Sequence, residues 1–158
     1  MRRFLDRLYL WSGYLGALFI VAICIAMVGQ SVLRELGVRT GAVNDVVSWF
    51  CAAAAFFTMA HAFKHGDFVR VTLMLESATP AKRRWLGLTS LVIGSIATAY
   101  LAWSACLFTY ESWEFNDMAQ GMLPMPLWIP QMSFALGAVL LWVAVVDELL
   151  LVLRGETP

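Results

Sequence analysis

Four long stretches of the chain contain no Asp, Glu, Lys or Arg, and they constrain the fold more than any other feature. They cover residues 8–33, 46–63, 85–110 and 118–146. The hydrocarbon core of a bilayer is about 30 Å thick, so a helix needs roughly 20 apolar residues to cross it. Each stretch reaches or approaches that length. The sequence therefore predicts four membrane spans.

The rest of the sequence is too short to form anything else. Of the 158 residues, 61% are hydrophobic and only 14% are charged, a composition typical of membrane proteins. Outside the spans remain a short N-terminal arm, three loops and a short tail, which leave no room for a soluble catalytic domain. We predict an all-α membrane protein with one four-helix domain over residues 1–158 and no enzyme activity. The expected spans cover about 12–33, 44–63, 85–110 and 127–150.

Positive charge is distributed unevenly between the two sides of this predicted domain. With four spans, nine of the 11 Lys and Arg residues fall on the side of the two termini, and only Arg34 and Arg39 fall on the other. The positive-inside rule then places both termini in the cytoplasm. The acidic loop that carries Glu111, Glu114 and Asp117 would face outward.

The loop between the second and third spans mixes apolar and basic residues. An unpaired strand beside lipid would leave backbone groups without partners, whereas a short helix in the interface would bury Phe68 and Leu73 and leave the Arg70 charge among the headgroups. We therefore predict a short interfacial amphipathic helix over about 67–79.

No group of residues predicts a metal, cofactor or catalytic site. Cys24, Cys51 and Cys106 lie within predicted spans without a CxxC pair, so we expect them to be reduced, small core residues. His61 and His65 are four residues apart at the end of the second span, but a metal would need a third ligand nearby. We expect packing or capping from the histidines, and no cofactor.

A pair of carboxylates, Asp147 and Glu148, lies near the end of the fourth span. A proton relay would need a carboxylate near the middle of the membrane, with a partner. We therefore favour an interface anchor, or a salt bridge to Arg83, Arg84 or a neighbouring subunit.

Asn44 and Asp45 stand where the second span is expected to begin. Side chains of both types accept hydrogen bonds from the free N–H groups of a first helical turn, and the helix dipole stabilises the Asp charge. We therefore expect these two residues to cap this helix.

Two further patterns indicate contacts with other proteins. Glu111 and Glu114 share a helix face, with Asp117 just beyond; this is either an ordinary solvated face or a docking patch for an extracytoplasmic partner. Ser90 and Gly94 are small residues four positions apart, which would allow close approach of a helix from this bundle or from another membrane protein.

Two segments of the chain resemble the signatures of a known family. One reads HGDFVRVTLM from His65 to Met74, including Asp67 and Arg70, and is followed by PAKRRWL from Pro80 to Leu86; the other reads GMLPMPLWIPQ from Gly121 to Gln131. With the four-span layout, they resemble the small membrane subunit, or Q subunit, of tripartite ATP-independent periplasmic (TRAP) transporters. The likeness covers nearly the whole chain.

The resemblance implies a part in a sodium-coupled, binding-protein-dependent transporter of organic acids, such as C4-dicarboxylates or sialic acid, in the bacterial inner membrane. Its partners would be a large membrane subunit, which holds the substrate and sodium sites, and a soluble periplasmic substrate-binding protein. The small subunit would brace the large one and help to dock the binding protein. No nucleic-acid partner is expected.

The same resemblance identifies the inner-loop motif of the family and its interfacial anchors. These residues are His65, Asp67, Arg70, Lys82, Arg83 and Arg84. The last three form a basic cluster that would attract the anionic headgroups of phospholipids.

Two other classes of protein stay open. A haem-binding anchor subunit of a respiratory enzyme would fit the size, but axial ligands usually come from histidines on different helices, whereas His61 and His65 lie at one helix end. An autonomous small oligomeric transporter would need an embedded carboxylate, and the charge-free stretches have none. The sequence therefore favours a structural subunit.

Overall fold

The computed structural model describes residues 2–38, 40–65 and 80–154, with side chains for residues 5–38, 40–64 and 85–154. In these residues the chain forms four helices: α1 (Arg2–Glu35), α2 (Gly41–His65), α4 (Pro80–Glu114) and α5 (Trp128–Leu153). Each helix is long and apolar enough to cross a membrane. The prediction of an all-α protein with four spanning helices is confirmed. The interfacial helix expected over about 67–79 lies outside the described residues.

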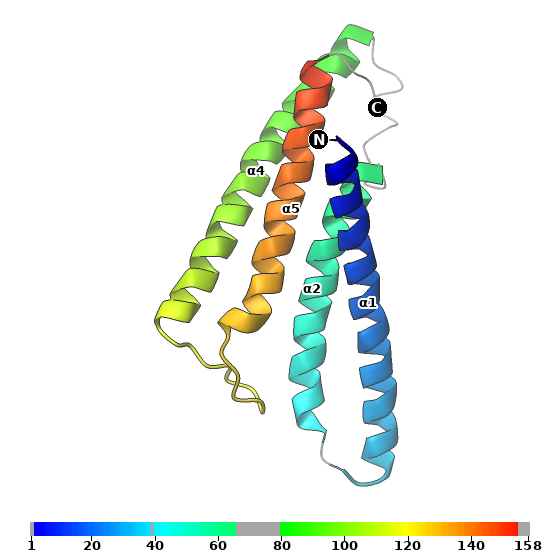
Figure 1. The fold of residues 1–158 in the computed structure, drawn as a ribbon, viewed down its shortest axis with the longest axis vertical. Coiled ribbons are helices and arrows are strands. Elements are labelled where there is room, and N and C mark those ends of the chain that lie inside the picture. The colour runs from blue at the N-terminus through cyan, green and yellow to red at the C-terminus, as the bar shows by residue number, and fades with distance from the viewer. Residues whose placement is uncertain (1, 39, 66–79, 155–158) are drawn as a thin grey trace.

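The outer helices are longer than the charge-free stretches that predicted them. α1 has 34 residues and α4 has 35, which corresponds to about 50 Å each at 1.5 Å per residue. The hydrocarbon core is only about 30 Å thick. Both helices must therefore tilt or extend beyond it, and Figure 1 shows α4 extending past the end of α5.

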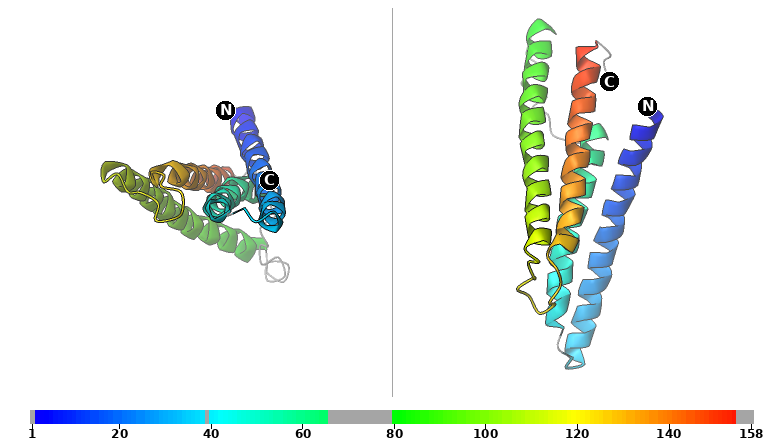
Figure 2. Two further views of the ribbon diagram at one scale, coloured as in Figure 1. Left: turned by 90° about the horizontal axis from the view of Figure 1, so that it is seen from below. Right: turned by 60° about the vertical axis from the view of Figure 1, so that its left-hand side comes forward.

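The four helices form an open row rather than a closed bundle. α1 packs on α2, α2 packs on α5, and α5 packs on α4, as the two views in Figure 2 show. Within the most apolar window of each helix, 39% of the residues of α5 are buried, but only 6% of α1 and 11% of α4. The central pair α2 and α5 run parallel (Figure 1), while each outer helix runs antiparallel to its neighbour.

Small side chains occupy most of the contacts between helices. One buried cluster joins α4 to α5 and consists of Ala102, Ala105, Ala135 and Ala138. A second joins α1, α2 and α5 and consists of Tyr9, Ala60 and Ala144. Lipid tails are as apolar as the side chains, so helices in a membrane associate through close packing rather than through the hydrophobic effect. The alanines provide that close packing.

Two glycines bring the neighbours of α2 especially close to it. A Cβ on Gly16 of α1 would overlap the side chain of Thr58, and a Cβ on Gly137 of α5 would lie 2.5 Å from the Cβ of Phe56. The Phe56 ring cannot easily withdraw, because it packs edge to face on Phe134 with 4.3 Å between the ring centroids. The absence of a side chain at both glycines therefore sets the spacing of the row.

The same backbone arrangement ends α1 and α4. Gly37 after α1 and Asn116 after α4 have positive φ angles of 77° and 51°. The N–H of the next residue then reaches back into the helix, as when Asp117 donates to the carbonyl of Ser112 at 3.1 Å. This is the Schellman arrangement, which satisfies carbonyls in the last turn. It fixes the direction in which the chain leaves each helix.

α2 begins earlier than expected. The helix starts at Gly41, and the carbonyl of Thr40 already accepts a helix-type hydrogen bond. Asn44 and Asp45 therefore lie inside the helix, and the interpretation of them as caps is wrong. Asn44 instead accepts a hydrogen bond from the Gln30 side chain of α1 at 3.0 Å, while Asp45 contacts the loop between α4 and α5.

We predict that adding one methyl group at the close contacts destabilises the row. Gly16→Ala and Gly137→Ala should each lower the free energy of unfolding by about 1–3 kcal/mol, because the new Cβ overpacks the interface. Gly29→Ala and Gly87→Ala are matched controls, since nothing lies within 4 Å of a Cβ at either position. Unfolding in mixed micelles measures the difference. Equal stability of all four variants would contradict this account of the packing.

Candidate functional site

The segment between α4 and α5 folds back on itself as a hairpin, here called the α4–α5 hairpin (residues 115–127). Two backbone hydrogen bonds hold its arms together: Ala119 donates to Met125 at 2.9 Å, and Leu127 donates to Asp117 at 2.8 Å. The hairpin lies at the same end of the row as the α1–α2 turn (Figure 1).

The three predicted docking carboxylates lie at the base of this hairpin. Glu111 and Glu114 belong to the last turn of α4, Asp117 belongs to the hairpin, and all three are exposed. The backbone of Asp117 is bonded on both sides, to Ser112 and to Leu127. The structure therefore brings the three residues to one end of α4 and holds the position of the third.

The tip of the hairpin rests on the first turns of α2. Its Met122 N–H donates a hydrogen bond of 2.8 Å to the Asp45 carboxylate. Gly121 lies against the same carboxylate, and the Met122 side chain lies against Gly41. We did not predict this contact. The sequence feature that could have predicted the contact is Asp45 itself, because an acidic residue within an apolar helix of a membrane protein implies a partner.

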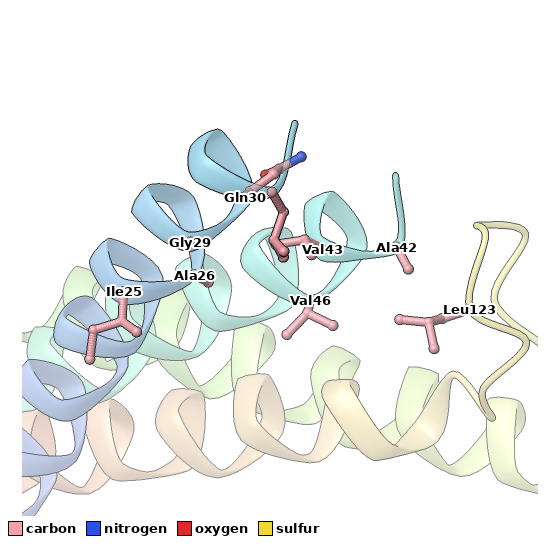
Figure 3. A pocket seen from close by; sticks show the side chains of 9 residues that line it. Ile25, Ala26, Gly29, Gln30, Ala42, Val43, Val46 and Leu123 are labelled. Carbon is pink, nitrogen blue, oxygen red and sulfur yellow. The ribbon is translucent and has the colours of Figure 1, made fainter. Parts of the chain in front are cut away.

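An open apolar groove of about 380 Å³ lies beside this contact (Figure 3). Its walls come from α1, α2 and the hairpin, and they include Ile25, Gly29, Leu33, Val43, Val46 and Leu123. The one polar side chain among its lining residues is that of Gln30, which is bonded to Asn44. Such a surface suits an acyl chain or an apolar side chain, and not an organic acid.

A polar cluster, here called the terminal polar cluster (Tyr9, His61, Lys64, Asp147 and Glu148), lies at the opposite end of the row. The Lys64 ammonium is 3.0 Å from the Asp147 carboxylate, and their side chains are only 20% and 17% exposed. The same ammonium lies 5.9 Å from the centre of the Tyr9 ring. His61 Nδ1 lies 3.2 Å from the Tyr9 carbonyl oxygen, and Glu148 is buried. The cluster therefore joins α1, α2 and α5.

The comparison with known families decides what kind of chain this is. Residues 23–155 match the family model described as tripartite ATP-independent periplasmic transporters, DctQ component. The chain belongs to the DctQ family. No match was found among curated proteins. The resemblance inferred from the two motifs is confirmed, and this DctQ chain is a multi-pass membrane protein and a component of a TRAP transporter.

The partner that the structure gives Asp147 in this DctQ chain is Lys64, a residue that the sequence did not single out. The two are 83 positions apart, and their pairing follows from the parallel course of α2 and α5, which brings the last turn of α2 beside the C-terminal part of α5. The side chains of Arg83 and Arg84, the partners considered from the sequence, lie outside the described residues.

The remaining residues of the predicted inner-loop motif also lie at or beyond the limits of the described structure. Only helical backbone is described for His65, Lys82, Arg83 and Arg84, and nothing is described for Asp67 and Arg70. The interpretation of these residues as family motif and interfacial anchors therefore stays a prediction.

The predicted packing pair on α4 divides between two environments. Ser90 is exposed on the surface of the row. Gly94 faces α5, where a Cβ would lie 3.9 Å from Val145. Within the described chain, Gly94 thus belongs to the α4–α5 contact and Ser90 does not.

The cysteines lie on the surface of the row, so the expectation that they are core residues is wrong. Cys24, Cys51 and Cys106 are all exposed. The reason is the open arrangement, in which α1 and α4, which carry Cys24 and Cys106, each have one neighbour, while α2, which carries Cys51, keeps surface that faces neither α1 nor α5. Alanine and glycine occupy the contacts instead.

We predict that the Lys64–Asp147 pair behaves as a partly buried ion pair. Lys64→Met or Asp147→Leu alone should destabilise the protein by an amount between the roughly 0.5 kcal/mol of exposed pairs and the roughly 3–5 kcal/mol of buried pairs. The double variant should be more stable than either single variant, because no unpaired charge remains. Thermal unfolding of the four proteins in detergent tests this. Strictly additive losses would show that the pair contributes no coupling.

Proposed function

We propose that this DctQ chain is a non-catalytic small permease subunit that braces the large membrane subunit of a TRAP transporter. The observation that carries the proposal is the open row of helices. A closed four-helix bundle hides its apolar positions inside, whereas a row of four presents two broad apolar faces. A flat row of this kind is suited to pack beside the large subunit and to enlarge the fixed scaffold against which its transport domain moves.

The outer helices supply the apolar surface that a membrane partner would cover. On α4, large side chains stay more than half exposed along the span, among them Ile93, Ile96, Tyr100 and Trp103. Interfaces between membrane proteins are commonly built from such large side chains together with small residues. A large subunit packed on this row would bury them.

Two features of the described spans support placing substrate and sodium on another subunit. The helices are continuous, and the terminal polar cluster lies at one end of the row rather than at mid-membrane, where transporters place their sites between broken helices. We therefore assign the substrate, an organic acid such as a C4-dicarboxylate or sialic acid, and the coupling sodium ions to the large subunit.

Charge supports an inner-membrane orientation with both termini in the cytoplasm. Nine of the 11 basic residues belong to the side of the termini, as the positive-inside rule requires for a cytoplasmic face. Lys82, Arg83 and Arg84 on that side would attract anionic phospholipids. The α4–α5 hairpin would then face the periplasm, where the soluble binding protein is found.

We further propose that Glu111, Glu114 and Asp117 help to dock the binding protein. All three carboxylates are exposed at the end of α4, and complementary charge accelerates the encounter of two proteins. A solvated face without a partner is the competing explanation, and the charge-reversal experiment below separates the two.

The first test of the bracing role is gentle purification of the chain from its native membrane. We expect a much larger polytopic protein in stoichiometric amount. Recovery of a homo-oligomer alone would favour an autonomous small transporter. A visible haem spectrum in the purified material would favour the anchor subunit of a respiratory enzyme.

We predict that replacing Glu111, Glu114 and Asp117 together by Lys slows association of the binding protein roughly tenfold at low ionic strength, because charge steering accelerates association by about 10- to 1,000-fold. The difference should shrink at high salt, where the Debye length falls to about 3 Å at 1 M. Stopped-flow association with the reconstituted transporter measures both effects.

A matched pair of single variants controls for charge alone. Glu35 and Glu114 are each the last residue of an outer helix at the same end of the row, and both are exposed. Glu114→Lys should slow association, whereas Glu35→Lys should have a much smaller effect. If both variants slowed association equally, the effect would come from the overall electrostatic field at this end of the protein and not from a docking patch at Glu114.

A further inference from the structure

The α4–α5 hairpin is held at two separate places. At its base, Asp117 is bonded through its backbone to Ser112 of α4 and to Leu127, the residue just before α5. At its tip, the Met122 N–H donates to the Asp45 carboxylate of α2 at 2.8 Å. The base therefore depends on α4 and α5, but the position of the tip depends on α2.

Two glycines make room for the tip contact. A Cβ on Gly121 would overlap the carboxylate of Asp45, and a Cβ on Gly41 would overlap the sulfur of Met122. Each side of the contact thus has a glycine, and a Cβ at either position would force the Asp45 carboxylate or the flexible Met122 side chain to shift. The contact therefore rests on the Asp45 carboxylate and on the close approach of Gly121 to it.

The tip contact also determines which surface the hairpin presents. Met118 and Met122 remain 54% and 76% exposed, and they lie on the same hairpin as Asp117. Exposed methionines and exposed carboxylates thus occur on the same hairpin and on the adjoining end of α4, and methionine packs readily against apolar partners of irregular shape. Complementarity then requires a partner with basic residues next to an apolar patch.

We infer that Asp45 is a positioning residue that holds the α4–α5 hairpin so that Met118, Met122 and the neighbouring carboxylates form one docking surface for a basic, partly apolar face of the periplasmic binding protein. This inference rests on the docking role proposed above. It adds the apolar half of the surface and the residue on α2 that orients it. Preorganisation of this kind raises affinity by lowering the entropy lost on binding.

Asp45→Ala and Asp45→Asn separate the position of the hairpin from the charge of the residue. Asp45→Ala removes the acceptor, whereas Asp45→Asn keeps a side-chain oxygen in the same place. Asn44→Ala is the matched control, because it removes a hydrogen bond to Gln30 from the same turn of α2 without touching the hairpin. The variants are compared in the full membrane complex in nanodiscs, with the binding protein of the same transporter as the probe.

Each variant is examined by two measurements. A nitroxide attached at the exposed residue 120, in a background with Ala at the three exposed cysteines, reports the mobility of the hairpin by electron paramagnetic resonance. Equilibrium binding reports the affinity for the binding protein. We expect Asp45→Ala to release the label and to weaken binding about tenfold, the scale of one lost charge-assisted hydrogen bond, and Asp45→Asn and Asn44→Ala to stay close to the parent protein in both.

Gly121→Ala provides a second route if Asp45→Ala fails to assemble with the large subunit. Gly121 does not have a positive φ, so the backbone accepts Ala, but the new Cβ would displace the Asp45 carboxylate. It should release the label and weaken binding in the same way as Asp45→Ala. An immobile label in both variants would overturn the assignment of Asp45.

The outcomes distinguish this inference from the docking role on which it rests. If the Lys variant of Glu111, Glu114 and Asp117 binds normally, the docking role itself is contradicted. If that variant binds weakly but Asp45→Ala frees the hairpin without loss of affinity, only the positioning role is overturned. If Asp45→Asn lost as much affinity for the binding protein as Asp45→Ala, the effect would be due to charge. That result would also overturn the positioning role of Asp45.

Discussion

The close approach of α2 to its two neighbours is the contact on which the rest of the structure depends. In water, four apolar helices would collapse around a core, but in lipid the apolar side chains gain little by turning inward. What remains is short-range packing, which is strongest where Gly16 and Gly137 bring the adjacent backbones towards α2. A helix with two such neighbours, followed by α5 with its own alanine contact to α4, produces a row and not a closed bundle.

Charged residues fix both ends of the central helix in this row. Lys64 near the end of α2 pairs with Asp147 of α5, and Asp45 near its start accepts a hydrogen bond from the hairpin. Asp45 lies near the start of α2 and Asp147 lies in the last third of α5, so both contacts are expected near the membrane surfaces, where water and headgroups lower the cost of charge. Packing of small residues thus sets the spacing between helices, while the polar contacts set how far α2 is shifted along its neighbours.

The sequence predicted the helices well because the cost of charge in lipid marks each span directly. Packing partners were harder to predict, since every side of an apolar helix looks alike when lipid accepts all of them. That is why Cys24, Cys51 and Cys106 were expected in the core and are exposed, and why Lys64 was not matched with Asp147. The Asn44 and Asp45 prediction failed for a different reason. The helix starts at Gly41, and a residue suited to capping was instead needed for a tertiary contact.

The two fixed ends of α2 bear on what a DctQ subunit is able to do. If α2 moved relative to its neighbours within the row, it would have to break the Lys64–Asp147 pair or the Asp45 contact, and it would have to slide past close glycine contacts. Transport domains move as rigid bodies against a partner that stays still. A row whose central helix is held at both ends and along its length is rigid within itself, as the bracing role proposed above requires. The hairpin that α2 holds would then keep a constant position relative to the rest of this subunit.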